Sequence, residues 1–156
     1  MTDSVETPGS LLDRDLPGFH RVLGYRQVAW RDGEAVLELS LEACHLNLGG
    51  SVHGGVLCSL LDVVLAQAGT YCPDPTRIRK AMTLTLTTTF TGQCGSGVIR
   101  ATGTRRAGGS RIFNSSGEIR DQHGHLLAIG EATFRLRSGS EAPEGVPLVP
   151  HDDSRQ

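Results

Sequence analysis

Hydrophobic and polar residues alternate along most of the second half of the chain, a pattern typical of β-strands. In residues 82–91 the alternation is strict, and its two faces consist of Met82, Leu84, Leu86, Thr88 and Phe90, and of Thr83, Thr85, Thr87 and Thr89. The same pattern predicts four further strands, at residues 35–41, 98–106, 111–120 and 126–137. Short turns at 108–109 and 121–124 join the last three, so these strands are expected to pair antiparallel.

One long apolar segment interrupts the β pattern. Residues 52–72 are mostly apolar and, at about 20 residues, are too long for a single strand, so they predict a helix. Pro73 and Pro75 are expected to end it. A single apolar helix must bury its surface against one face of the sheet. The pattern therefore predicts an α+β fold in which an antiparallel β-sheet wraps around one long central helix.

The two ends of the chain differ in composition from its centre. Residues 1–10 are polar and acidic and predict a flexible leader. Residues 138–156 are rich in Gly, Ser, Pro, Glu and Asp and predict a disordered tail. Residues 11–23 are expected to hold a short helix or turn, interrupted by Pro17-Gly18. The folded domain is accordingly expected to span residues 11–137.

Composition and charge exclude several classes of function. The chain has 156 residues, enough for one globular domain, and its formal net charge of -2 gives no reason to expect a nucleic acid partner. It has no signal-peptide segment, no polybasic patch and no apolar run near the ~18 residues of a membrane span. The four cysteines form no CxxC pair. We therefore expect a cytoplasmic protein with reduced thiols and without a metal or other cofactor.

The predicted helix contains one unexpected charge, at Asp62. Residues 56–68 are apolar on nearly every side, which is typical of a buried helix. A carboxylate buried without a partner costs several kcal/mol in free energy. Asp62 is therefore expected to be paired, to lie at an interface or to have a function. The alternative to catalysis is a hydrogen bond to a backbone group or to a nearby Ser or Thr that only stabilises the fold.

The start of the same helix has a second notable feature, the sequence His53-Gly54-Gly55. Backbone N–H groups in a first helical turn have no partner within the helix, and glycine lets a ligand approach them closely. Such an end can polarise a carbonyl oxygen, although two glycines can also simply connect a loop to a helix. Gly54 and Asp62 would lie ~12 Å apart along the axis. They could act on one bond only if two antiparallel helices, related by a two-fold axis, each supplied one of them.

These residues resemble a known family. The run from Asn47 through His53-Gly54-Gly55, followed by Asp62 seven positions after the second glycine, is similar to the PaaI-like (phenylacetate-degradation) branch of the hotdog-fold acyl-CoA thioesterases. The expected order of strands agrees, and the resemblance covers roughly residues 20–137. It implies a hotdog fold and hydrolysis of an acyl-CoA, often an aromatic one, to the free acid and CoA. It also implies a homodimer or homotetramer whose active sites are shared between chains.

The resemblance assigns roles to individual residues. Asn47 and the Gly54 N–H would polarise the thioester carbonyl, and Asp62 of the neighbouring chain would act as general base on water or as nucleophile. Thr83 would orient that water. His53 and Gly55 would belong to the substrate-binding segment, with His53 supporting the loop. Ala66 stands where Glu-type relatives have a Ser or Thr, so the sequence is nearer to the Asp-type pattern.

Two other functions remain open on the sequence: a non-catalytic acyl-CoA-binding hotdog protein, and a hotdog hydratase or dehydratase. His123 and His125 lack further ligands at a metal-binding spacing, so no metal site is predicted. Arg105, Arg106 and Arg111 flank a hairpin and could meet CoA phosphates, although each is also a common type of surface residue.

Overall fold

The computed structural model describes residues 18–149. Its helices are α1 (Phe19–Leu23) and α2 (Gly54–Ala68), with a 3-10 turn, η2 (Ala43–His45), between them. Its strands, in chain order, are β1 (Arg26–Arg31), β2 (Glu34–Ser40), β3 (Arg77–Ile78), β4 (Ala81–Phe90), β5 (Val98–Gly108), β6 (Ile112–Asp121), β7 (Leu126–Leu136) and β8 (Val146–Pro147).

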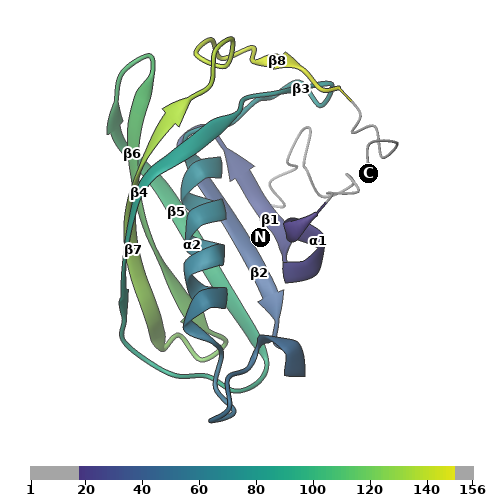
Figure 1. Cartoon of the computed structure of the whole chain (residues 1–156), viewed down its shortest axis with the longest axis vertical. Coiled ribbons are helices and arrows are strands. Elements are labelled where there is room, and N and C mark those ends of the chain that lie inside the picture. The colour runs from purple at the N-terminus through teal and green to yellow at the C-terminus, as the bar shows by residue number, and fades with distance from the viewer. Residues whose placement is uncertain (1–17, 150–156) are drawn as a thin grey trace, which may run out of the picture.

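Six of the strands form one antiparallel sheet in the order β1-β2-β5-β6-β7-β4. The sheet curves around α2, with β1 and β2 on one side of the helix and β4 and β7 on the other (Figure 1). This confirms the predicted α+β class and the single wrapped helix. It also makes β4 an edge strand, although β4 is ten residues long.

A row of glycines lets α2 approach the sheet closely. Gly103, Gly117 and Gly130 are direct neighbours across β5, β6 and β7. A Cβ atom on Gly103 would lie 2.7 Å from the Val64 carbonyl oxygen, and one on Gly130 would lie 3.0 Å from the Leu61 side chain. The sheet therefore has no side chains along the line where the helix crosses it, and five residues of α2 are buried there, namely Leu57, Leu60, Leu61, Val64 and Leu65.

The helix is shorter than the apolar segment that predicted it. It begins at Gly54 rather than at residue 52, because His53 is its N-cap, and it ends at Ala68, before the predicted limit at residue 72. Just past its end, a Cβ on Gly69 would overlap the Phe113 ring. The strand β1 was not predicted at all. Its polar residue Gln27 is buried, and the side-chain amide donates to Gln67 Oε1 at 2.7 Å. Because a polar residue takes a buried position, the strand lacks a simple alternation of apolar and polar residues.

The prediction of a disordered tail from residue 138 is wrong for residues 138–149. Strand β8 pairs with β3, and the two run over one end of the sheet (Figure 1). Ser140 is buried, and its Oγ accepts a hydrogen bond from the Lys80 N–H at 2.9 Å. Arg79 donates to the Ser140 carbonyl oxygen at 3.0 Å. Backbone and side-chain hydrogen bonds order a segment with few apolar residues. The predicted leader, residues 1–10, and the end of the predicted tail lie outside the described residues.

Candidate active site

The N-terminus of α2 has one backbone N–H group without a partner. His53 caps the helix, since its Nδ1 accepts a hydrogen bond from the Gly55 N–H at 2.8 Å. The N–H groups of Val56 and Leu57 donate to the His53 carbonyl oxygen. Within residues 18–149 the Gly54 N–H donates to no acceptor. Gly54 therefore has the one first-turn donor that a ligand can use.

The reason for glycine at position 54 is space and not backbone conformation. Gly54 is not among the glycines with positive φ. A Cβ atom there would lie 3.2 Å from the Phe90 ring, which belongs to the last residue of β4 and is 54% exposed. The sequence did not point to Phe90 as a site residue. The signal that could have identified it is a large aromatic residue at the end of a strand whose other face consists of threonines.

Gly55 and His53 act together as the helix cap. A Cβ on Gly55 would lie 3.0 Å from His53 Nδ1, so glycine leaves room for the capping imidazole. Because the Gly55 N–H already donates to that ring, it is not free to bind a substrate. His53 thus supports the helix start, as expected, and contact of either residue with a substrate stays a prediction.

Asn47 lies in the loop before α2 with its side-chain amide fixed in one orientation. Its Oδ1 accepts hydrogen bonds from the N–H groups of Gly49 at 2.9 Å and Ser51 at 3.2 Å. Because the oxygen already accepts from the loop, the Nδ2 group is left to donate elsewhere. Asn47, Gly54 and Phe90 line the same open depression of about 430 Å³, with buried Val52 and Leu57 at its base. The structure therefore brings two of the predicted carbonyl-binding groups together.

Asp62 lies two turns further along α2, where its side chain is half-buried. The Thr83 hydroxyl of β4 donates to Asp62 Oδ1 at 2.6 Å. Asp62 is thus paired with a neighbouring threonine, which is one of the expected explanations for its position. The same bond holds the carboxylate in one orientation, so it does not exclude a catalytic role.

The contact with Asp62 depends on a β-bulge that the sequence pattern did not reveal. Strict alternation predicted that Thr83 shares a face with Thr85 and Thr87, and this is wrong. The pairing of β4 with β7 shifts between Thr83 and Thr85. Thr83 consequently faces α2, whereas Thr85 and Thr87 line a hollow on the opposite face of the sheet.

The two halves of the candidate site lie at opposite ends of one helix–strand pair. Gly54 meets Phe90 at one end, and Asp62 meets Thr83 at the other. Eight residues of α-helix separate Gly54 from Asp62, a distance of ~12 Å. One chain alone therefore does not bring the carboxylate to the carbonyl-binding groups.

Solved structures of other proteins share this architecture. Zebrafish thioesterase superfamily member 2 is 26% identical, with a TM-score of 0.66 over 79% of this chain and 89% of its own. The PaaI protein of the Escherichia coli phenylacetic acid degradation operon is also 26% identical, with a TM-score of 0.67 over 76% of this chain and 83% of its own. The chain has the hotdog fold of the PaaI-like thioesterases.

A third hotdog structure is more distant. A hypothetical thioesterase from Streptococcus pneumoniae, solved with coenzyme A, is 20% identical, with a TM-score of 0.63 over 72% of this chain and 85% of its own. That likeness concerns the fold alone. No protein-family model matches the sequence, and no curated protein matches it.

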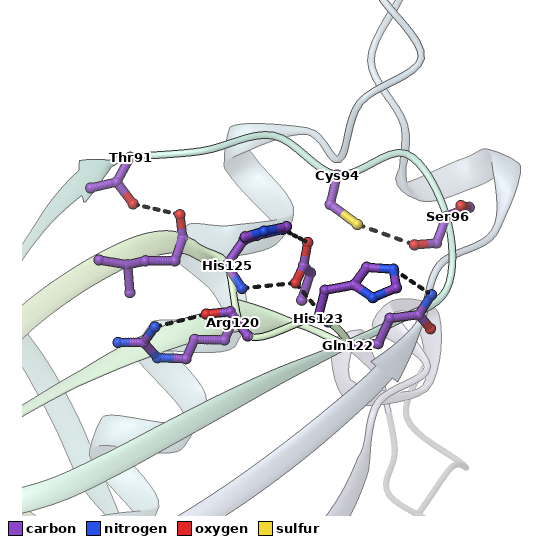
Figure 2. A network of polar contacts seen from close by, with 10 residues as sticks. Thr91, Cys94, Ser96, Arg120, Gln122, His123 and His125 are labelled. Atoms are coloured by element: carbon purple, nitrogen blue, oxygen red, sulfur yellow. Dashed lines mark hydrogen bonds and ion pairs between the residues drawn. The ribbon is translucent and has the colours of Figure 1, made fainter.

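A second group of polar residues lies in the turn between β6 and β7 of the hotdog sheet (Figure 2). Asp121 Oδ1 accepts the N–H groups of His123 and His125, and its Oδ2 is 3.1 Å from His125 Nδ1. Desolvation alone would raise the pKa of Asp121, but these hydrogen bonds together lower it below its usual value. The bonds close the turn, which is a sufficient explanation of the cluster.

Three further properties concern the described residues as a whole. No three His, Cys, Asp or Glu side chains in residues 18–149 are arranged to hold a metal ion. Over the same residues, no helix has the length and apolar character needed to cross a membrane. All four cysteines are free.

Proposed function

We propose that the protein hydrolyses acyl-CoA thioesters in a site formed by two chains. The observation that supports this most strongly is the chemistry at two places on α2. The start of the helix offers a single unused N–H, that of Gly54, beside the Asn47 amide. The middle of the helix holds a carboxylate, Asp62, oriented by Thr83. Carbonyl polarisation and an oriented carboxylate are what hydrolysis of a thioester by water needs.

The reaction follows from these groups. The Gly54 N–H and Asn47 Nδ2 donate to the thioester carbonyl oxygen and stabilise the negative charge that develops there. Asp62 accepts a proton from a water molecule, whose oxygen attacks the carbonyl carbon. The tetrahedral intermediate then expels the CoA sulfur, which takes up a proton, and the acid is released. In the alternative role an Asp62 oxygen attacks the carbonyl carbon and expels the CoA sulfur, which takes up a proton. The resulting mixed anhydride is hydrolysed by water to the free acid and Asp62, and hydroxylamine would capture it.

The dimer is proposed from the exposed surfaces of the same two elements. Strand β4 is a long edge with exposed apolar side chains, including Met82 and Leu84, and unpaired edges favour pairing with another chain. The side of α2 that is not fully buried carries small or polar residues, namely Gly55, Cys58, Ser59, Asp62 and Ala66, beside the partly buried Val56 and Val63. A two-fold axis relating two such surfaces brings the Asp62 end of one chain to the Gly54 end of the other.

Cross-linking through Cys58 tests this arrangement directly. It is four residues from Gly54 and four from Asp62, so an axis that exchanges those positions passes close to it. In a chain whose only cysteine is Cys58, the other three being serine, a short bis-maleimide should link two chains covalently. The matched control has Cys44, which is exposed, as its only cysteine and should give little dimer on a denaturing gel. Equal yields from both proteins would contradict the arrangement.

A thiol-release assay over an acyl-CoA panel tests the activity. We expect release of free CoA thiol, and the panel should include phenylacetyl-CoA and benzoyl-CoA beside straight-chain substrates, since the similar Escherichia coli protein belongs to a phenylacetic acid degradation operon. Binding of CoA esters without thiol release would indicate the non-catalytic binding protein instead. Hydration of an enoyl-CoA without thiol release would indicate a hydratase.

A further inference from the structure

The arginines without a partner gather at one place on the surface. Most arginine side chains in residues 18–149 form an ion pair, a hydrogen bond or a ring contact. Within that part of the chain the exceptions are Arg111, Arg135 and Arg137. All three line the same open hollow of about 480 Å³. Arg105 and Arg106, which the sequence had also suggested, are not among its lining residues, and they contact Phe113 and Ser116.

The hollow lies where three chain segments are fixed against one another. Arg135 of β7 is the direct neighbour of Met82 on β4. The Leu136 N–H donates to the Arg111 carbonyl oxygen, and the Arg137 N–H donates to the Lys80 carbonyl oxygen, both at 2.8 Å. The backbone around the hollow is therefore held by hydrogen bonds, and the three guanidinium groups project from a rigid frame.

The charges of this hollow are not balanced within the described chain. Its one lining carboxylate is Glu141, whose Oε2 accepts a hydrogen bond from the Gly139 N–H at 2.7 Å. Three guanidinium groups beside one carboxylate repel each other, and an anion with more than one negative charge relieves that repulsion. Arginine also matches phosphate oxygens in a two-bond geometry that lysine lacks. The chemistry of the hollow suits a phosphate-bearing ligand.

We propose that Arg111, Arg135 and Arg137 form a binding site for a ligand with at least two phosphate charges. In one chain, Met82 beside the hollow and Phe90 beside the pocket lie ~26 Å apart along β4. In the antiparallel two-fold dimer, the start of β4 in one chain lies beside the end of β4 in the other. In this dimer the hollow of one chain and the pocket of its partner lie at the same end of the paired β4 strands, so the nucleotide end of a bound CoA would extend toward the hollow. This identification of the ligand rests on the proposed function, whereas the phosphate chemistry does not.

Titration calorimetry in phosphate-free buffer at low salt tests the site, with adenosine 3′,5′-bisphosphate, inorganic phosphate and CoA as probes. Replacing any of the three arginines by glutamine, as in Arg135→Gln, should weaken binding of the bisphosphate about tenfold. The matched control is Arg31→Gln, which removes the same charge from a surface pair with Glu34 on β1 and β2. It should leave binding unchanged. Asp62→Asn protein should bind as the parent does, so the result does not depend on catalysis.

The outcomes separate the two sources of phosphate. If CoA binding weakens in parallel and KM for acyl-CoA rises at constant kcat, the ligand is the nucleotide end of the substrate. If the bisphosphate or phosphate binds through the arginines while KM is unchanged, the ligand is a separate phosphorylated molecule. Failure of all the probes to bind the parent protein would overturn the proposal, and so would equal affinities in Arg135→Gln and Arg31→Gln.

Discussion

The two ends of the contact between α2 and β4 offer different chemical groups. At the Gly54 end the available group is a backbone N–H that donates to no acceptor in residues 18–149, with the Phe90 ring beside it. At the Asp62 end the available group is a charged side chain, held by the Thr83 hydroxyl. The first end can stabilise a developing negative charge and the second can accept a proton, and neither can do both.

This difference explains why the site requires two chains. A backbone donor at a helix start cannot be moved along the helix, and a carboxylate two turns away cannot reach it. A two-fold axis brings the carboxylate of one chain to the backbone donor of the other, with no change in the structure of either chain. Substitutions at the two ends should therefore lower activity for different reasons. At the Gly54 end an added side chain should obstruct the substrate, and at the Asp62 end a substitution should remove the charge or its fixed orientation.

The largest expected effect is at Asp62. Asp62→Asn keeps the shape of the side chain and removes the base, and kcat should fall by ~10²–10⁴. The melting temperature should stay close to that of the parent, because asparagine can still accept the Thr83 hydrogen bond. Steady-state kinetics and thermal melting on the same preparation check both statements. A fall in kcat of less than about threefold in folded protein would rule out the catalytic role.

Gly54 should show the next largest effect. Gly54→Ala places a methyl group where the carbonyl must approach, and kcat should fall by about 10²–10³, as for loss of one oxyanion donor. Gly54→Val should abolish activity. Because the added Cβ also meets the Phe90 ring at 3.2 Å, the same change is made in a Phe90→Leu background.

A double-mutant cycle separates the two explanations for Gly54. If the methyl group obstructs the substrate, Gly54→Ala/Phe90→Leu remains as impaired relative to Phe90→Leu as Gly54→Ala is relative to the parent. If glycine is needed only to make room for the ring, the double variant regains the activity of Phe90→Leu, and the oxyanion role is excluded.

Thr83 should give the smallest effect of the three. Thr83→Val removes the hydroxyl that orients Asp62 and should lower kcat about tenfold, the typical value of a hydrogen bond to a charged group. Thr83→Ser should retain most of the activity. The matched control, Thr87→Val, changes the opposite face of the same strand and should behave like the parent. Equal kinetics for Thr83→Val and Thr87→Val would show that the bond to Asp62 serves only the fold.

Features that depend on the spacing of residues close together in the sequence could be predicted. The Asn47–Gly54–Asp62 spacing marks the loop, the helix start and the carboxylate, and the apolar segment and alternating stretches gave the helix and five of the six sheet strands. Gly54 and Asn47 do line one depression, and Thr83 does contact Asp62. Their roles in catalysis stay predictions.

Features that depend on tertiary contacts were not predictable in the same way. The bulge that turns Thr83 toward α2 interrupts an apparently strict alternation, because the strand must follow both β7 and the helix. Strand β1 contains a polar residue, Gln27, that is buried only because Gln67 lies opposite. Phe90 became a site residue only through its contact with the helix start. Each of these depends on a partner distant in the sequence, which no local pattern reveals.

The measurement that tests the central claim most directly is subunit complementation. Asp62→Asn and Asn47→Ala chains are each expected to be nearly inactive, because each loses one half of every site. Mixed one to one under conditions where subunits exchange, half of the dimers contain one chain of each kind and one intact site. Activity should return to roughly a quarter of the parental value. No recovery after demonstrated exchange, for example by native mass spectrometry of labelled chains, would contradict a site shared between two chains.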